Sequence, residues 1–269
     1  PVEFSLVGTA PAATPLKEKA LPEAVHIDFS GSAAQLEQIG KPITKGIKMA
    51  PAMAGEWVWA SDSRLSFTPR QDWAVDQEYV VEFQRSLFPD HVRLEEYEYR
   101  FRSAPFTASI EQIEFYQDPR DPKLKKVVAT LLFSHAVDTA DLEKRIGLRM
   151  QGQKEGVLGF GRESYPYTIT YDKFHGAAYI HSAAVTIPLK DTHMELSIDA
   201  GARAAAGGQP LKDKLARTVW IPGVYNFFRI QSASLTLVRN ERYEPEQVLV
   251  VQTTAGVLGM AMLRFCEHP

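Results

Sequence analysis

Short runs in which apolar and polar residues alternate constrain this chain more than any other feature. The residues from Val25 to Phe29 alternate in this way, and a period of two places every second side chain on one face of a β-strand. Similar runs recur at 57–59, 65–67, 79–83 and 98–102. Proline and glycine lie between them, where they set turn geometry and end hydrogen-bond ladders. Short strands separated by turn signals are typical of a β-sandwich.

The same pattern continues after Pro105. Further strands are predicted over 110–116, 127–133, 167–171, 178–180, 185–187 and 196–198. Of these, 127–133 is continuously apolar, which predicts a strand in the centre of a sheet. Helix signals are few. Asp138 can cap a short helix that runs through Arg145, and 33–39 predicts one further short helical turn. We therefore expect an all-β fold.

An internal echo predicts two modules of the same kind. One strand ends in Phe29-Ser30 and another in Phe133-Ser134, an offset of 104 residues (133 minus 29). Each is followed by a polar segment and an alternating run that ends in methionine. The offset is about the size of one immunoglobulin-like sandwich. We expect tandem immunoglobulin-like β-sandwiches over 1–105 and 106–227, in preference to one large β-domain.

The last segment, 228–269, predicts three more strands. They are expected over 235–238, 247–252 and 257–265, with turns at 240–242 and 253–256. About forty residues is near the lower limit for an independent fold. This segment is therefore expected to be the start of a third module, or terminal strands docked on the second.

Charge and cysteine content exclude several classes of protein. The chain has 30 basic and 33 acidic residues among 269, a net charge of −3, which is too even for nucleic acid or an anionic membrane as the main partner. No run approaches the ~20 apolar residues that span a bilayer. Cys266 is the single cysteine, so no intrachain disulfide or cysteine-based zinc cluster can form. Because the sequence begins at Pro1 and ends soon after the apolar stretch 258–265, we expect an excised piece of a longer protein.

Motifs that carry catalysis or metal binding do not stand out. The sequence contains no nucleophile elbow, zincin helix, P-loop or EF-hand loop. The glycine-rich run 156–161 is followed by Pro166, which argues against the helix start that a phosphate cradle needs. His175, His181 and His193 are near one another in sequence, but zinc requires imidazoles about 2 Å from one point. We expect surface histidines, and we predict no catalytic, cofactor-binding or metal-binding residue and no cofactor.

Aromatic and acidic clusters allow two interpretations each. Trp57, Trp59 and Trp73 suit a sugar-stacking platform or a sandwich core, and alternation on a strand favours the core. Acidic residues between 95 and 98 suit an acid–base pair or a cross-strand charge ladder, and the interleaved basic residues favour the ladder. The acidic residues are Glu95, Glu96 and Glu98, and the basic residues of the same stretch are Arg93, Arg100 and Arg102. Hydrolysis by a pair of carboxylates distant in sequence stays open.

Two further features have an ordinary interpretation that we prefer. The charged, proline-stiffened loop 118–123, with Lys125 and Lys126 beyond it, suits a partner site, but a solvated loop is favoured. Cys266 has His268 nearby, yet a nucleophile also needs an orienting group and a pocket. A terminal thiol without a catalytic role is expected.

One stretch resembles a signature of bacterial immunoglobulin-like modules. The tryptophan strand 55–59 turns into the strand 65–69, which ends in Phe-Thr-Pro, and after Trp73 a tyrosine begins the strand 79–81. Together with the second module and the apolar run 246–251, the pattern is similar to the amino-terminal half of bacterial alpha-2-macroglobulins. The segment 25–106 carries most of the likeness.

The resemblance implies a string of macroglobulin-like sandwich domains in a large periplasmic protein. Such proteins are thought to trap proteases when cleavage of a bait region collapses the body around the attacker. Many carry a thioester from a Cys-x-Glu-Gln element. Here Cys266 is followed by Glu267 and His268, so no thioester residue is carried over, and no bait region is identified.

The role implied for this chain is that of a scaffold that transmits or resists the collapse. The implied partners are proteases, bound through the full-length protein, and other periplasmic or inner-membrane proteins. An inner-membrane anchor would come from a signal or lipid outside this sequence. We predict that the chain is not an enzyme.

Two other functions are kept as alternatives. The first is a binding or spacer module of a bacterial adhesin or surface-layer protein. The second is a β-sandwich hydrolase or a carbohydrate-binding accessory, because fold does not settle function. The full-length gene separates the first from a macroglobulin, since tandem repeats with a cell-wall anchor indicate an adhesin. A sugar-binding screen that shows no loss of affinity on Trp57→Ala or Trp73→Ala, beyond the effect of unfolding, would remove the second.

Overall fold

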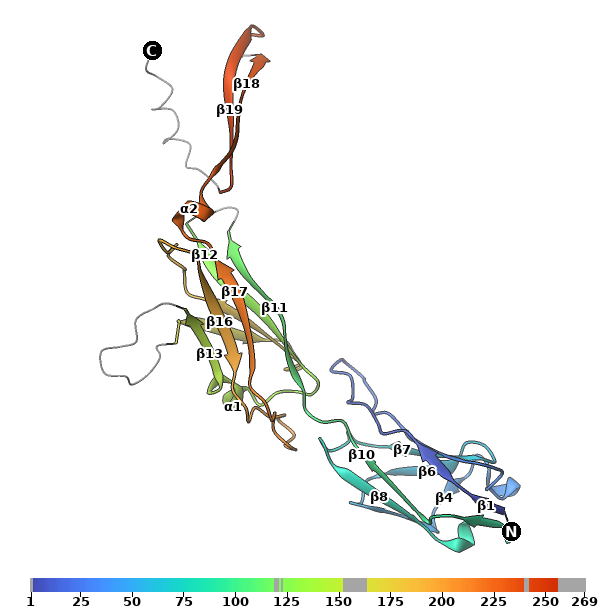
Figure 1. Ribbon diagram of the computed structural model, residues 1–269. Coiled ribbons are helices and arrows are strands. Elements are labelled where there is room, and N and C mark those ends of the chain that lie inside the picture. The colour runs from blue at the N-terminus through green and yellow to red at the C-terminus, as the bar shows by residue number, and fades with distance from the viewer. Residues whose placement is uncertain (1, 119–120, 122, 152–163, 240–241, 256–269) are drawn as a thin grey trace, which may run out of the picture.

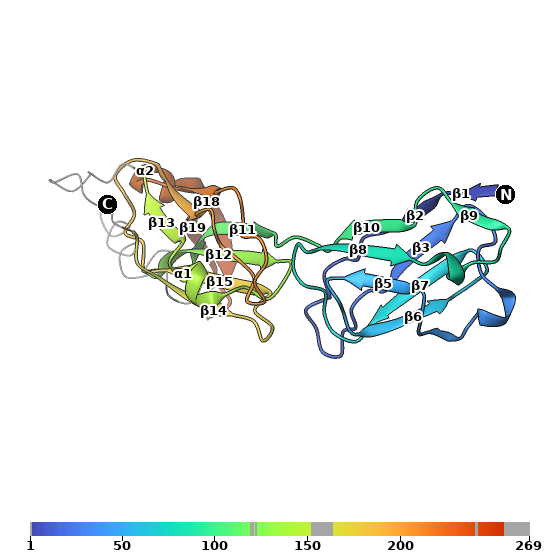
Figure 2. The same ribbon diagram turned by 90° about the horizontal axis from the view of Figure 1, so that it is seen from below.

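The structure is a computed structural model that describes residues 2–118, 121, 123–151, 164–239 and 242–255. Two β-sandwiches lie end to end, and a two-stranded hairpin projects beyond the second (Figure 1). The view from below shows the same end-to-end arrangement of the two sandwiches (Figure 2). The predicted all-β fold of tandem immunoglobulin-like sandwiches is confirmed.

The first sandwich packs a five-stranded sheet against a three-stranded sheet. The larger sheet has the order β2-β3-β7-β6-β4, and the smaller one has the order β10-β8-β5. Their bounds are β2 Leu6–Gly8, β3 Val25–Phe29, β4 Pro42–Ile43, β5 Ile47–Ala50, β6 Gly55–Trp59, β7 Arg64–Pro69, β8 Glu78–Phe83 and β10 Glu98–Arg102. A short parallel pair, β1 (Val2–Phe4) with β9 (Val92–Leu94), lies beside them. The 3-10 turns are η1 (Leu36–Gln38) and η2 (Arg85–Leu87).

The second sandwich packs a four-stranded sheet against a three-stranded sheet. Their orders are β11-β12-β15-β14 and β13-β16-β17. The bounds are β11 Ala108–Gln117, β12 Lys125–Phe133, β13 Ile146–Met150, β14 Tyr167–Tyr171, β15 Ala177–Ser182, β16 Thr192–Ile198 and β17 Leu215–Ile221. The short helix α1 spans Thr139–Glu143, and α2 spans Val224–Phe227. The hairpin consists of β18 (Ile230–Arg239) and β19 (Pro245–Thr253).

The two sandwiches share one topology. Seven strands of each sandwich can be numbered in chain order, if β1, β4 and β9 of the first sandwich are left out. One sheet of each sandwich then joins strands one, two, five and four, and the other joins strands three, six and seven. In the first sandwich these are β2-β3-β7-β6 and β5-β8-β10, with β4 added at one edge. This is the ABED and CFG arrangement of a constant-type immunoglobulin fold. The predicted echo thus corresponds to the same strand in each sandwich, β3 and β12.

Each sandwich has its own buried core. In the first core, Phe29, Trp59 and Phe67 pack with other aromatic rings, and Trp59 and Phe67 are almost fully buried. In the second, aliphatic residues such as Leu131 and Leu196 dominate. Trp59 Nε1 is buried without a hydrogen-bond partner. The domain boundaries at 105/106 and 227/228 stay predictions, because a core is defined by packing and not by where a module can be cut.

Most predicted strands are present, with a few differences that have physical reasons. Asp138 caps α1, as predicted, by accepting a hydrogen bond from Asp141 N at 3.1 Å, but the helix ends at Glu143 and does not run through Arg145. The predicted strand 185–187 is wrong. Val185 N donates to the Lys125 carbonyl, but these residues do not continue into a ladder, and Pro188 has no backbone N–H to extend one. The helical turn expected over 33–39 is limited to the 3-10 turn η1. The predicted strand 257–265 lies outside the described residues.

Candidate functional site: the junction between the two sandwiches

One valine of the first sandwich is buried in the core of the second. Val75 belongs to the connection between β7 and β8 of the first sandwich, yet it is 4% exposed and packs in the core of the second. Gly208, which belongs to the second sandwich, lies against it with a φ of +88°. A Cβ on Gly208 would be 2.6 Å from the Val75 Cβ, so both the backbone angle and the contact require glycine. Val75 therefore couples the packing of the two sandwiches.

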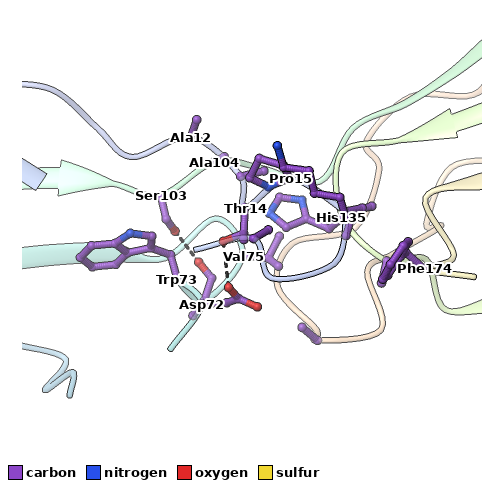
Figure 3. A pocket seen from close by; sticks show the side chains of 17 residues that line it. Ala12, Thr14, Pro15, Asp72, Trp73, Val75, Ser103, Ala104, His135 and Phe174 are labelled. Carbon is purple, nitrogen blue, oxygen red and sulfur yellow. Dashed lines mark hydrogen bonds between the residues drawn. The ribbon is translucent and has the colours of Figure 1, made fainter. Parts of the chain in front are cut away.

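A cavity of about 280 Å³ lies beside this contact (Figure 3). Side chains from both sandwiches line it, among them Thr14, Asp72 and Val75 from the first and His135 and Phe174 from the second. Thr14 is part of loop 9–24, which connects β2 to β3. The cavity is small for a ligand site, since such sites span about 300–1,000 Å³.

Hydrogen bonds hold loop 9–24 against the β7–β8 connection. Thr14 Oγ1 donates to Asp72 Oδ1 at 2.8 Å, and Trp73 Nε1 donates to the Glu23 carbonyl at 2.8 Å. Ser103 Oγ donates to the Ala74 carbonyl and accepts from Gln77 N. The polar groups of the buried Trp73 and Ser103 therefore have hydrogen-bond partners, and Thr14 and Asp72 bond to each other nearer the surface.

Loop 9–24 also reaches the second sandwich. Leu16 Cδ1 lies 2.5 Å from where a Cβ on Gly176 would stand, so this glycine allows close approach. Glu18 pairs with Lys173, but both side chains are 70% exposed, and such pairs contribute little. The apolar contact of Leu16 is therefore the stronger link across the junction.

The turn that receives Leu16 is shaped by Asp172. Its carboxylate accepts from Ala177 N at 2.7 Å and from Phe174 N at 3.2 Å. Burial raises the pKa of Asp172, but donation from the amides of Ala177, Phe174 and Gly176 outweighs it and lowers the pKa overall. The charged carboxylate thus holds a turn in which His175 has a φ of +54°.

His135 is a half-buried titratable group at the junction, close to Asp72. Burial lowers the pKa of its imidazole, and the negative charge of Asp72 partly opposes this shift. Its Nδ1 lies 2.9 Å from Ser134 Oγ. The same hydroxyl accepts from Thr107 N at 2.8 Å and faces the Pro105 carbonyl at 3.3 Å. Because these backbone contacts engage Ser134, the arrangement suits structural support rather than an activated nucleophile.

The three candidate histidines do not converge. His175 is on the turn after β14, His181 is on β15, and His193 is on β16 of the opposite sheet; all three are exposed. Among the residues that the structure describes, no group of three or more His, Cys, Asp or Glu side chains is placed to hold a metal ion. The glycine-rich run 156–161 and Cys266 lie outside the described residues.

The tryptophans are core residues, as predicted. Trp57, Trp59 and Trp73 are 9%, 0% and 7% exposed. Trp57 packs on Phe67 with ring centroids 4.9 Å apart, and Trp73 meets Phe101 at 5.4 Å. Their faces are therefore covered, which removes the sugar-stacking platform.

The predicted charge ladder is present in part. Glu98 pairs with Arg100 at 2.5 Å, while Arg102 reaches across to Glu78 on β8 at 3.1 Å. Glu95 and Glu96 line a shallow hollow beside them. In loop 118–123, the described residues make local turns, since Lys123 N donates to Asp121 Oδ1 at 3.0 Å. In the described part of the chain, no helix is long and apolar enough to cross a membrane.

Sequence reasoning missed the junction. Val75, Leu16 and Gly208 are isolated residues in loops, and no periodic pattern marks them. Among these three residues, only Gly208 has a local sequence signal: it follows Gly207, and paired glycines indicate a turn. Both glycines have a positive φ in the structure.

The fold and the junction together define a class of protein: immunoglobulin-like sandwiches of one topology, arranged in tandem. No family model matches the chain. It is 28% identical over 239 residues to an alpha-2-macroglobulin homolog of Yersinia pestis, covering 88% of this chain and 12% of that protein. It is 28% identical over 238 residues to an alpha-2-macroglobulin of Pasteurella multocida, covering 87% of this chain and 12% of that protein. A third match, 24% over 244 residues, is to an alpha-2-macroglobulin of Rickettsia conorii, covering 85% and 12%.

These matches confirm the predicted resemblance to bacterial alpha-2-macroglobulins. The chain spans 12% of the length of these relatives. A solved structure, the collagen adhesin of S. aureus, aligns with 82% of this chain and 92% of that chain at 8% identity and a TM-score of 0.18. A score this low carries no argument for or against an adhesin.

Proposed function

We propose that this chain is a scaffold segment of a bacterial alpha-2-macroglobulin-like inhibitor that traps proteases in the periplasm. The observation that carries the proposal is the similarity to three proteins named alpha-2-macroglobulin over 85–88% of the chain. Trapping is an activity of the full-length protein. The part played by this chain is mechanical.

The junction supports a mechanical role. A body that closes around a protease needs segments that move as units, because force is transmitted only through parts that keep their shape. Val75 inserts into the neighbouring core, and Leu16 meets Gly176 across the same junction. These apolar contacts link the motion of one sandwich to that of the other.

We also propose that the chain has no catalytic activity of its own. The hydroxyls at the junction are engaged in structural hydrogen bonds, as Thr14 is with Asp72 and Ser103 with Ala74. A nucleophile needs a base and an orienting group around an open position. The contacts at the junction support a structural role for these hydroxyls.

The test of trapping uses the full-length protein with a broad-specificity protease. Enclosure hinders large substrates but leaves a protease active site open to small ones. We expect the protease to co-elute with the protein, to lose activity on a protein substrate and to keep activity on a short peptide. A protease that elutes free and cleaves both substrates at unchanged rates would contradict the proposal.

A variant pair tests the part played by this chain. Val75→Ala removes contacts at the junction, whereas Val7→Ala changes a valine of β2 that is 68% exposed. We expect the first to reduce the fraction of protease retained by the full-length protein and the second to leave it unchanged. Equal retention in both variants would remove the mechanical role from the junction.

The periplasmic location is part of the proposal and has its own test. Fractionation of cells that produce the full-length protein is expected to place it with periplasmic marker proteins, or with the inner membrane if it carries an anchor. Cross-linking in the same cells would identify further periplasmic or inner-membrane partners. Recovery with cytoplasmic markers alone would contradict the location.

A further inference from the structure

His135 comes from the second sandwich but lies at its boundary with the first. It follows the end of β12, and its half-buried side chain lines the cavity between the two sandwiches. Figure 3 shows the imidazole directed toward the part of loop 9–24 that carries Thr14 and Pro15. The imidazole therefore faces the first sandwich, and separation of the two sandwiches would expose it to water.

The other side of the imidazole is tied to the segment that links the sandwiches. Its Nδ1 lies 2.9 Å from Ser134 Oγ. The linking segment bonds to the same hydroxyl, because Thr107 N donates to Ser134 Oγ at 2.8 Å and the Pro105 carbonyl lies 3.3 Å from that oxygen. The ring is thus held between the link and loop 9–24, so a change in its charge acts on the boundary between the sandwiches.

The contact with Ser134 does not select one protonation state of the ring. A neutral imidazole either accepts a hydrogen bond from a hydroxyl or donates one to it, depending on its tautomer, whereas an imidazolium only donates. The contact is therefore compatible with both states. Burial and neighbouring charges decide which state the docked ring adopts.

Two charged side chains line the cavity together with His135. Asp72 comes from the β7–β8 connection, and Lys17 comes from loop 9–24. The carboxylate favours a charged imidazole, whereas the ammonium group disfavours one. Both side chains are exposed, so water and salt screen these two opposing effects.

The other charged groups on the elements around the cavity have partners of their own. Within the described residues, these are Glu18 with Lys173, Asp76 with Arg102, Asp138 with Arg203, Glu23 with the amide of Ala12, and Asp172 with the amides of its turn. Lys19 is exposed and is not among the residues that line the cavity. His175 is exposed and lies beside Tyr171, with ring centroids 5.6 Å apart. Asp72 and Lys17 are therefore the charged groups that face His135 across the cavity.

Apolar side chains from both sandwiches line the rest of the cavity. Pro15 and Val75 come from the first sandwich and Phe174 from the second. Burial among them lowers the pKa of His135, and the charge of Asp72 opposes this shift only in part. The docked arrangement therefore binds a proton less readily than a histidine that is exposed to water.

We propose that His135 makes the contact between the two sandwiches sensitive to pH: the neutral imidazole lets loop 9–24 and the β7–β8 connection dock on the second sandwich, and protonation of the ring weakens that docking. Because the separated state binds the proton more readily, docking weakens as the pH falls from above 6.5 toward the pKa of the docked ring. Each unit by which docking lowers the pKa weakens docking by about tenfold once the ring is charged in both states. This role of His135 does not depend on protease trapping.

Distances between spin labels at Lys41 and Lys190 test the proposal in the full-length protein with Cys266→Ser. Both positions are exposed, one on each sandwich. We expect a narrow distance distribution at pH 7.5 and a broader one at pH 5.5, which narrows again when the pH is restored. A distribution of equal width at both pH values would overturn the proposal. A narrower one at pH 5.5 would overturn it too, because an ion pair of His135 with Asp72 would then hold the sandwiches together.

A matched pair of histidine variants identifies the responsible ring. His135→Gln removes the titrating group and keeps a polar side chain at the junction, whereas His181→Gln changes an exposed histidine of β15. We expect the distribution of the first to stay narrow at pH 5.5 and that of the second to broaden as in the wild type. Equal broadening in both variants would assign the pH dependence to other groups and overturn the proposal.

Asp72→Asn separates the imidazole from the carboxylate as the source of the effect. Asparagine keeps an oxygen that accepts from Thr14 but removes the charge that favours the imidazolium. We therefore expect a larger broadening at pH 5.5 than in the wild type. A smaller broadening would make protonation of Asp72 the cause and overturn the proposal.

Hydrogen–deuterium exchange at the imidazole C2 position, read by mass spectrometry, gives the pKa of His135 directly and applies if His135→Gln alters the junction by itself. We expect a pKa below 6.5 in the full-length protein. Leu16→Ala removes a contact across the junction and should move this pKa back toward 6.5. Leu21→Ala, at a position of the same loop that is 82% exposed, should leave it unchanged. Equal pKa values of His135 in both variants would overturn the link between docking and protonation.

Discussion

Replacing Val75 with alanine is expected to destabilise a sandwich to which Val75 does not belong in sequence. The side chain is buried in the core of the second sandwich although it lies between β7 and β8 of the first. The change removes the equivalent of two buried methylene groups, each of which contributes roughly 0.8 kcal/mol of transfer free energy. The cavity left behind adds about 1 kcal/mol, at about 24 cal/mol per Å³. We expect a loss of about 2–3 kcal/mol in the free energy of unfolding of the second sandwich.

Native-state hydrogen exchange resolves where the loss occurs. We expect amides of β12 and β16 to lose protection by a factor of roughly 30–150, which is the same free energy at about 1.4 kcal/mol per tenfold change. Amides of β3 and β7 should change less, because Val75 is not part of their core. Val7→Ala is the matched control. A loss confined to β3 and β7, or no loss at all, would refute the packing of Val75 in the second core.

Three further changes test the packing of the junction, the core of the first sandwich and the titration of the junction. Gly208→Ala adds a Cβ 2.6 Å from Val75 at a φ of +88°, so the melting temperature of the second sandwich should fall; an unchanged melt would show that the loop relaxes freely. Trp57→Ala should cost roughly 3–5 kcal/mol in denaturant melts, the usual cost of emptying an aromatic core site, and a change below ~1 kcal/mol would contradict its place in the core. Burial lowers the pKa of His135 below its ordinary value of 6.5, so the unfolded chain binds the proton more readily than the folded chain. The free energy of unfolding is therefore expected to decrease as the pH falls from above 6.5 toward the pKa of the folded state. Melts at pH 7.5 and 5.5 should therefore differ less in His135→Gln than in the wild type, and an equal difference would assign the pH dependence to other groups.

Alternation was enough to predict strands that bury one face. In β3, the side chains of Val25, Ile27 and Phe29 are buried and those between them are half-buried, so sequence period and burial coincide. β17 was missed because its residue types do not alternate: the apolar Trp220 is 47% exposed, and the polar Arg217 shares a face with Leu215 and Val219. The run 185–187 was wrongly predicted as a strand because Val185 is buried without joining a ladder.

The Phe-Ser echo predicted two like modules without revealing its cause. The serines close the first hairpin of each sandwich through a hydroxyl that accepts a backbone hydrogen bond, and threonine does the same at 254. At this position the sequence is Thr253-Thr254, so a search for Phe-Ser misses a hydrogen bond that a threonine hydroxyl makes equally well.

The junction could not be predicted from the sequence. Burial of Val75 depends on how two folded modules meet, which is a property of their surfaces and not of local periodicity. A lone valine in a loop has the same sequence context whether it is exposed or buried. The positive φ of Gly208 is likewise evident only once Val75 is placed against it.

The coupling of the two sandwiches is tested most directly by a distance measured between them. Spin labels at Lys41 and Lys190, both exposed, report on the first and second sandwich respectively, in a full-length protein with Cys266→Ser. Pulsed electron resonance is expected to give one narrow distance distribution, unchanged after a protease is added. A broad distribution, or one that shifts when protease is added, would contradict a pair of sandwiches that moves as a unit.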